Sequence, residues 1–287
     1  MNEVLKLTLE EVSRLEDVAA SYDSFPEYKE GYILFALKIE KINFTLYKSG
    51  KLVVQGKDDI KTQSLLKSIK IAIFSDIEFD VSMTGSDEAG KGDVFGPLVV
   101  AAVYCDNHIL KQFKMLGIGD SKKFSDEKIT DLSFKIIKIA PYSIMLLEPS
   151  KYNELYDKMN NLNRMLSWAH HKVNENLKSQ KDFKLTVIDD FGMKKKAQNW
   201  IRDQLNVELR LETKSEDKYP AVAAASILAR ARMVEWFRGT GLPKGASNTD
   251  LIKQKIIGIL DKDGIEGLKD VSKYHFSTVK KIVNEYC

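Results

Sequence analysis

The chain has 287 residues, 44% of them hydrophobic and 30% charged, with a formal net charge of +3. This composition is that of an ordinary globular protein of one large or two smaller domains, and the charge is too small to identify a nucleic-acid partner by itself. Its two cysteines offer no disulfide framework or paired metal motif, and no apolar stretch approaches the ~20 residues that cross a membrane. The start is acidic and unlike a targeting peptide, so we expect a cytoplasmic protein without membrane association.

Residues 1–75 have the pattern of a separate small unit. Thr8 is placed to cap a first helix, and Asp58 and Asp59 precede a second. Three strand-like runs lie between these helices, at residues 32–40, 42–47 and 52–55. The first two runs alternate between apolar and polar residues, so we expect a sheet with one apolar face that the two helices cover. The opposite face is polar and includes Tyr47.

This polar face has two interpretations. Between Lys38 and Lys70 there are eight lysines against three acids, a local excess of five. An ordinary solvated sheet face explains the pattern. An open platform for nucleic acid explains it as well, with lysines on phosphates and Tyr47 available to stack on a base.

Residues 76–81 form a predicted linker to a larger unit at 82–287, in which strand and helix patterns alternate. The expected strands are a run entering Asp87 and runs at 98–104, 142–147 and 185–188; the expected helices follow Ser125 and cover 153–177 and 221–237. This alternation predicts an α/β unit.

The segment GSDEAGKG, residues 85–92, has two possible functions. It matches the first seven positions of a phosphate-binding loop, G-x-x-x-x-G-K, but Gly92 stands where Ser or Thr should ligate magnesium. Such a loop must also open a helix, and here Gly96-Pro97 and a strand-like run follow. A nucleotide hydrolase is therefore disfavoured, and the two acids of the segment become the candidate functional groups.

Acidic side chains stand at the ends of three predicted core elements. Asp87 and Glu88 follow one strand, Asp189 closes another, and Glu216 precedes an alanine-rich helix, with Asp217 as the adjacent alternative. Carboxylates gathered at one edge of a sheet stay ionised only if cations neutralise them, and hard oxygen donors suit Mg²⁺ or Mn²⁺. Two such ions can promote phosphodiester cleavage. On spacing alone, ordinary surface carboxylates and helix caps remain the alternative.

Four segments in chain order resemble the type 2 ribonuclease H family: GSDEAGKGDVFGPLVVAAVY, GDSKKFSDEKI, VIDDF and KSEDKYPAVAAASILARAR. The resemblance implies a ribonuclease H-like catalytic domain over 82–287, with a mixed sheet flanked by helices. It also implies that four carboxylates are catalytic and hold two Mg²⁺ ions, with Mn²⁺ as a substitute: Asp87, Glu88, Asp189 and Glu216. The fourth acid is usually Asp in ribonuclease HII, so Glu216 is more similar to the HIII branch.

Other segments are also similar to ribonuclease HIII, namely GSDE, YNELYDKMNNLNRMLSWAHH, LPKGAS and KYHFSTVKK. This resemblance implies that residues 1–75 are a TATA-binding-protein-like substrate-binding domain. One departure is Lys91 in a Gly-Lys-Gly loop, where HII has Gly-Arg-Gly and HIII typically Gly-Thr-Gly. In relatives the backbone of this loop reads the 2′-hydroxyl of RNA. We therefore expect substrate contacts from Gly90, Lys91 and Gly92, and phosphate contacts from Ser121, Lys122 and Lys123.

The activity that the resemblance implies is cleavage of the RNA strand of RNA/DNA hybrids by a monomer, leaving 3′-hydroxyl and 5′-phosphate ends. An enzyme that also cuts at single ribonucleotides in DNA, as ribonuclease HII does, is one alternative. A non-catalytic hybrid-binding protein is another. His170 and His171 are neighbours in a predicted helix and point ~100° apart, so they cannot chelate one metal together, and we expect packing or surface roles for them.

Overall fold

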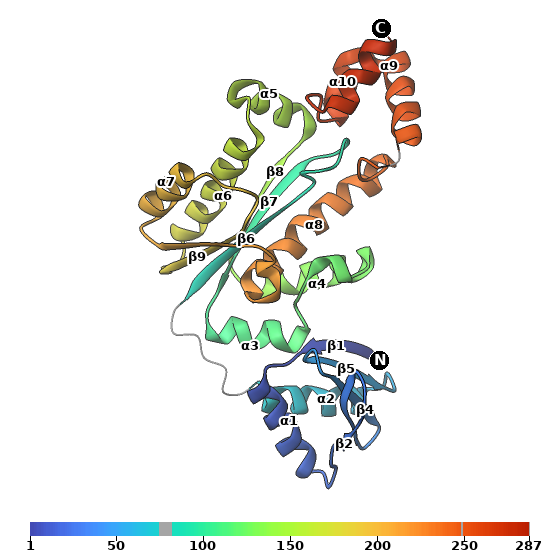
Figure 1. Ribbon diagram of the computed structural model, residues 1–287, viewed down its shortest axis with the longest axis vertical. Helices are drawn as coiled ribbons and strands as arrows, with labels where there is room; N and C mark the ends of the chain where they lie inside the picture. Colours follow the sequence, from blue (N-terminus) through green and yellow to red (C-terminus); the bar gives the residue numbers. More distant parts are fainter. Residues whose placement is uncertain (75–81, 248, 287) are drawn as a thin grey trace. The chain divides into compact units, whose positions relative to one another are not determined.

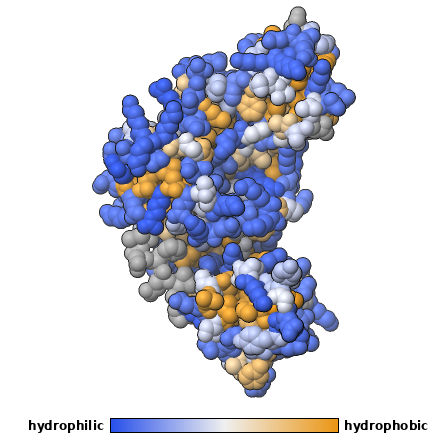
Figure 2. Space-filling model, viewed as in Figure 1, coloured by the Kyte–Doolittle hydropathy of each residue, from blue (hydrophilic) through white to orange (hydrophobic). Residues whose placement is uncertain are grey.

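The computed structural model describes residues 1–74, 82–247 and 249–286, and the predicted linker at 76–81 lies outside them. The described residues form two compact units (Figure 1). The first takes in those of Met1–Phe79 and Asn107–Ile118, and the second those of Asp80–Asp106 and Gly119–Cys287. None of the helices described is long and apolar enough to cross a membrane. The face drawn in Figure 2 is mostly hydrophilic, with apolar side chains in separate clusters.

The first unit is an antiparallel five-stranded sheet in the order β1-β5-β4-β3-β2. Its strands are β1 (Asn2–Lys6), β2 (Glu27–Tyr28), β3 (Ile33–Ile39), β4 (Ile42–Tyr47) and β5 (Lys51–Gly56), and its helices are α1 (Leu9–Ala20), α2 (Ile60–Ile73) and α3 (Asn107–Leu116). The three predicted strands and the two predicted helices are all present. The short edge strands β1 and β2 were not predicted, since five and two residues give too little alternation.

Helix α1 begins at its predicted cap, Thr8, and α2 begins directly after Asp59, one of the two acids expected before it. The Thr8 hydroxyl accepts from the backbone of Glu11 at 3.3 Å, and the Glu11 carboxylate accepts from the backbone of Thr8 at 2.8 Å. The Asp59 carboxylate accepts from the backbone of Thr62 at 2.8 Å. The apolar residues of both helices share one core with the alternating residues of β3, β4 and β5, as expected for a sheet covered on one face.

Helix α3 is distant in sequence but packs in the first unit. The Lys70 ammonium donates to the carbonyl of Met115 at 2.8 Å and pairs with Glu3. The Lys114 ammonium lies 3.2 Å from the Glu11 carboxylate. Nothing local in the sequence of α3 indicates this grouping, because its partners lie in residues 1–74.

The second unit is built on a mixed sheet in the order β10-β9-β6-β7-β8. Its strands are β6 (Met83–Ala89), β7 (Leu98–Cys105), β8 (Tyr142–Leu147), β9 (Leu185–Asp189) and β10 (Glu208–Glu212). Strand β9 runs parallel to β6 and β10, whereas β7 is antiparallel to β6 and β8.

Helices flank both faces of this sheet: α4 and α8 on one side, α6 and α7 on the other (Figure 1). The remaining helices include α5 and the C-terminal pair α9 and α10, which share a core with Val94, Phe95 and Phe237. The helices are α4 (Asp126–Ile139), α5 (Pro149–Met159), α6 (Leu162–Lys178), α7 (Lys195–Leu205), α8 (Pro220–Thr240), α9 (Thr249–Val271) and α10 (Ser277–Tyr286). The predicted mixed sheet flanked by helices is therefore confirmed.

Gly85 explains how α8 lies directly against β6. A Cβ atom at this position would stand 2.2 Å from the backbone nitrogen of Val222, closer than any real contact. The first turns of α8 are also made of small buried residues, from Ala221 to Ala225. The turn before α8, η2 (Ser215–Asp217), contacts both α8 and β9.

The segment GSDEAGKG is mostly strand. Residues 83–89 form β6, and β7 begins at Leu98 without a helix in the described stretch between them. A phosphate-binding loop would need that helix, so the nucleotide-loop interpretation is excluded.

Candidate active site

The four candidate carboxylates lie at one end of the mixed sheet. Asp87 and Glu88 are near the end of β6, and Asp189 is the last residue of β9. These two strands are parallel neighbours, and Ser86 pairs with Ile188, so that Asp87 and Asp189 follow side by side. Glu216 lies in η2. The structure thus brings together residues that are up to 129 positions apart (216 minus 87) in the sequence.

Asp87 is buried, with 9% of its surface exposed. Burial, and then the negative charge of Glu88, raise the pKa of Asp87 to about 7, and Asp189 adds to the effect. Hydrogen bonds from the backbone of Glu88, at 2.7 Å, and from the Ser226 hydroxyl oppose the rise only in part. A buried carboxylate in such surroundings favours any species that brings positive charge.

Glu88 is held by one partner on each carboxylate oxygen. Its Oε1 lies 2.7 Å from Nζ of Lys91, and its Oε2 lies 3.2 Å from Nε2 of His170. Burial by itself would raise the pKa of Glu88, but the bonds and charges of His170 and Lys91 lower it below its ordinary value. Glu88 is therefore ionised in the folded protein near neutral pH.

His170 is a residue of the site that sequence reasoning missed. It lies on α6, is fully buried, and contacts Glu88 through one ring nitrogen and the Ser86 hydroxyl through the other, at 2.9 Å. Its ring also stacks on Phe191. The neighbouring His171 instead packs against Trp200. The expected packing role thus describes His171, but not the whole role of His170.

Asp189 and Glu216 are joined by the turn that carries Glu216. The Asp189 carboxylate accepts from the backbone and hydroxyl of Ser215. Glu216 is 8% exposed; its Oε1 lies 3.4 Å from Lys122, and its buried Oε2 has no hydrogen-bond partner among the described residues. The side chain of Asp217, by contrast, is 41% exposed and faces Lys123. Of the two alternatives at this turn, Glu216 is buried and Asp217 is part-exposed.

The glycine loop after β6 has one glycine that the backbone requires. Gly90 has a φ of +87°, and a Cβ atom there would stand 2.2 Å from the carbonyl oxygen of Pro97. At Gly92 a side chain would meet nothing within 4 Å, so the backbone there is open to close approach.

Ser121, Lys122 and Lys123, the three candidate contact residues of the DSKK segment, differ in their surroundings. The Ser121 hydroxyl is buried and lies 2.8 Å from that of Ser226, so it serves packing between η1 (Ser121–Lys123) and α8. The side chains of Lys122 and Lys123 are 79% and 66% exposed and lie beside Glu216 and Asp217. The two lysines, but not the serine hydroxyl, are therefore open to a ligand.

The residues of the site fit a divalent cation. Four carboxylates supply hard oxygen donors, and the buried Oε2 of Glu216 is an acceptor that needs a positive partner. As the side chains stand, no three His, Cys, Asp or Glu residues of the described part converge closely enough to enclose a metal. The reason is visible in the contacts above: Glu88 faces Lys91, Asp189 faces Ser215, and Glu216 faces Lys122.

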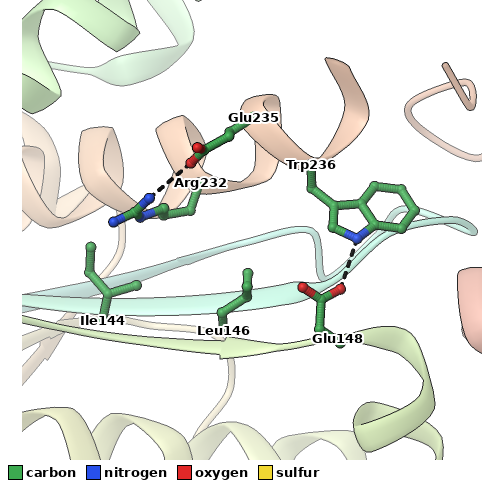
Figure 3. Close-up of a pocket in the computed structure, with 6 residues that line it drawn as sticks. All are labelled: Ile144, Leu146, Glu148, Arg232, Glu235 and Trp236. Atoms are coloured by element: carbon green, nitrogen blue, oxygen red, sulfur yellow. Dashed lines mark hydrogen bonds and ion pairs between the residues drawn. The ribbon is translucent and has the colours of Figure 1, made fainter. Parts of the chain in front are cut away.

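A cavity of about 470 Å³ opens elsewhere in the same unit, between β8 and α8 (Figure 3). Its lining residues are Ile144, Leu146, Glu148, Arg232, Glu235 and Trp236. The Trp236 indole donates to Glu148 at 2.8 Å, and Arg232 pairs with Glu235 at 2.9 Å. None of these is a candidate carboxylate, so the cavity is not part of the site.

Comparison with known proteins agrees with this architecture. Residues 84–279 match the family model described as ribonuclease HII, and residues 2–71 match a domain of unknown function, DUF3378. Curated relatives include ribonuclease HIII from Protochlamydia amoebophila, 35% identical over 88% of each chain, and from Bacillus anthracis, 34% identical over 93% of this chain and 94% of the relative.

Two solved structures extend the similarity to the fold. One is Bst-RNase HIII in complex with Mn²⁺, with a TM-score of 0.66 and 27% identity over 100% of this chain and 99% of that one. The other is RNase H3 from Aquifex aeolicus, with a TM-score of 0.56 and 25% identity over 96% and 100%. A mixed sheet with carboxylates at its edge, in this fold, defines a ribonuclease H-like enzyme. The chain belongs to the ribonuclease HIII branch of the type 2 ribonuclease H family.

Proposed function

We propose that the protein is an endonuclease that cuts the RNA strand of RNA/DNA hybrids, acting as a monomer in the cytoplasm and leaving 3′-hydroxyl and 5′-phosphate ends. The observation that carries the proposal is the burial of Asp87 between Glu88 and Asp189, which raises its pKa to about 7. Such a group binds a proton or a metal ion, and the oxygen donors around it suit Mg²⁺, with Mn²⁺ as a substitute. That a relative was crystallised with Mn²⁺ supports this choice.

The proposed metal ligands are Asp87, Glu88, Asp189 and Glu216. Two divalent ions in such a site supply an activated water and neutralise the leaving oxygen of a phosphodiester. The protein's part is to hold these carboxylates in place, through Ser215 on Asp189 and His170 on Glu88.

The other predicted residues contact the substrate in this proposal. Gly90 and Gly92 keep the loop backbone close to the ribose edges, and Lys91 lies between them. Lys122 and Lys123 are exposed beside the acids and contact phosphates, whereas Ser121 acts through its place in η1.

The first unit supplies a further substrate-binding surface in this proposal. Its uncovered sheet face carries Lys6, Lys38, Lys51 and Tyr47 on the sides of the strands that point away from the helices. Lys6 lies directly opposite Lys51 in the register of the antiparallel strands β1 and β5. In this proposal residues 1–75 are a substrate-binding domain, 76–81 are a linker and 82–287 are the catalytic domain. Helix α3 belongs to the last of these ranges but packs in the first unit.

The test is cleavage of two labelled duplexes in Mg²⁺: a complete RNA/DNA hybrid, and DNA with one embedded ribonucleotide. We expect cleavage of the hybrid alone. Cleavage of both duplexes would favour the alternative specificity of ribonuclease HII. If the folded protein binds the hybrid in Mg²⁺ and Mn²⁺ without cutting it, the enzyme proposal fails and a hybrid-binding protein remains.

A further inference from the structure

The two oxygens of Glu88 have partners of different character. Oε2 meets His170, whose side chain is fully buried, whereas Oε1 meets Lys91, whose side chain is 43% exposed. Only 7% of the Glu88 side chain is exposed. One oxygen is therefore fixed from inside the protein, and the other is covered by a flexible cation from the solvent side.

His170, the inner partner of Glu88, belongs to a chain of hydrogen bonds. Glu88 is ionised and can only accept, so Nε2 of His170 donates to its Oε2, and Nδ1 lies 2.9 Å from the Ser86 hydroxyl. The Ser86 oxygen in turn accepts from the side-chain amide of Asn174 at 3.2 Å. This chain of hydrogen bonds holds Oε2 from inside the protein.

The outer partner occupies the place of a cation. Lys91 stands in the open glycine loop, and its ammonium is 2.7 Å from Oε1. An ammonium and a divalent ion compete for the same carboxylate oxygen because both are attracted by its charge. Lys91 is on a flexible stem, so the contact can break without moving β6.

We propose that Lys91 is a built-in counter-ion, which covers Oε1 of Glu88 in the metal-free protein and is displaced when a divalent cation binds, while His170 keeps Oε2 in position. The proposal rests on the assignment of Glu88 as a metal ligand. It makes Lys91 a residue that sets how tightly the site binds metal, and His170 a positioning residue.

The first test is a calorimetric titration of the full-length, substrate-free protein with MnCl₂. Lys91→Thr removes the competing cation, and we expect it to bind Mn²⁺ about two- to five-fold more tightly, the range expected for the loss of one part-exposed ion pair. Lys91→Arg keeps the positive charge and should bind no more tightly than the wild type.

The matched control is Lys218→Thr. It removes one positive charge two residues from Glu216, but its ammonium pairs with Glu212, not with Glu88. We expect affinity like that of the wild type. Equal tightening in Lys91→Thr and Lys218→Thr would show a general charge effect and overturn the proposal. A wild-type protein that binds no Mn²⁺ would instead overturn the proposed function itself.

The second test follows Lys91 directly. Brief treatment of the wild-type protein with acetic anhydride, followed by mass spectrometry, measures how accessible each lysine is. We expect acetylation of Lys91 to rise when Mg²⁺ is added, with no change at Lys158, which pairs with Glu154 away from the four carboxylates. Unchanged acetylation of Lys91 at saturating metal would mean that its contact with Glu88 survives metal binding, contrary to the proposal.

Discussion

Asp189 and Ser215 are joined by two hydrogen bonds: Oδ1 of Asp189 accepts from the backbone of Ser215 at 3.1 Å and from its hydroxyl at 2.8 Å. Ser215 is fully buried and directly precedes Glu216. One proposed metal ligand, at the end of β9, thus fixes the turn that carries another. The relationship couples the two positions, because a shift of the turn would move Glu216 and leave Oδ1 of Asp189 unpaired.

Ser215→Ala should therefore lower hybrid cleavage without abolishing it. The variant loses one hydrogen bond to a charged oxygen, worth ~1.5–3 kcal/mol, and we expect a fall in kcat of about tenfold or more. The measurement is kcat on a saturating RNA/DNA hybrid in Mg²⁺. The control is Ser68→Ala on α2, whose hydroxyl donates to the carbonyl of Ser64 at 3.2 Å. If both variants cleave like the wild type, the turn does not depend on Asp189.

Asp87→Asn should remove cleavage while leaving hybrid affinity close to that of the wild type. The amide keeps the size of the side chain but not the charge that binds a cation, and the lysines proposed to contact the substrate are untouched. Cleavage and equilibrium binding of the same labelled hybrid measure the two effects separately. Residual activity above about ten per cent of wild type would contradict the role given to Asp87, because even the loss of a residue that only orients a metal ligand usually costs about tenfold or more.

The same variant should change how the stability of the metal-free protein depends on pH. The pKa of Asp87 is about 7 in the folded state and about 4 in an unfolded chain. Between these values the folded state binds more protons than the unfolded state, so the free energy of unfolding falls as the pH rises. The wild type should thus lose stability from pH 5 to pH 8 in the presence of a chelator.

Melting temperatures of the chelated wild type and Asp87→Asn at pH 5 and pH 8 check this expectation. At pH 8 the variant should melt at a higher temperature than the wild type. This difference in melting temperature should shrink at pH 5, because the wild-type carboxyl is protonated and neutral at that pH. Adding Mg²⁺ at pH 8 should raise the melting temperature of the wild type more than that of the variant. The same pH dependence in both proteins would show that Asp87 does not titrate as stated.

Lys273 is a buried residue whose side chain bonds backbone carbonyls. Its ammonium donates to the carbonyls of Asp93, Phe95 and Gly96, and burial lowers its pKa to about 8. Lys273→Met would leave three carbonyls without their donor and should cost ~2–4 kcal/mol of stability. Urea unfolding measures the loss. Lys269→Met, which removes a part-exposed ion pair with Glu266, should cost under ~1 kcal/mol.

The sequence allowed much of the fold to be predicted, since the strands β3 and β4 of the first sheet alternate between apolar and polar residues, and β7 of the second is one continuous apolar run. Leu37 and Ile39 alternate with Lys38, and the helix caps at Thr8 and Asp59 are local patterns. The grouping of α3 with the first unit is different: it depends on Lys70 and Met115, which are 45 positions apart. No local pattern carries such information.

In the candidate site, too, local sequence patterns indicate some residues, whereas others depend on the packing of distant segments. Acids at the ends of strands can be read from a sequence, because the strand patterns stop at Asp87 and Asp189. His170 could not be assigned, since the neighbouring His171 has the same residue type and the same helix, and only the packing of α6 decides which ring meets Glu88. The difference in burial between Glu216 and Asp217 also depends on the turn, which buries one side chain and leaves the other part-exposed.

The uncovered sheet face of the first unit leads to a prediction about salt. Deleting residues 1–75 is a poor test, because it would also remove the partners of α3, among them Lys70 and Glu11. A double variant of the full chain, Lys38→Ala with Lys51→Ala, removes two exposed ammonium groups from that face instead. If both contact phosphates, hybrid affinity should fall and the slope of log K against log salt should become shallower by about 1.8, at roughly 0.9 per contact.

The matched control is Lys61→Ala with Lys67→Ala, which removes the same charge from exposed positions on α2. Affinities of the three proteins for one hybrid, measured at several KCl concentrations with Ca²⁺ in place of Mg²⁺, give the three slopes. If the lysines act only through long-range attraction, the affinity of both variants for the hybrid should fall equally, since that attraction depends on net charge. A shallower slope in the first variant only would place the nucleic acid on the sheet face, whereas equal slopes in all three would leave that face solvated and the substrate bound by the second unit.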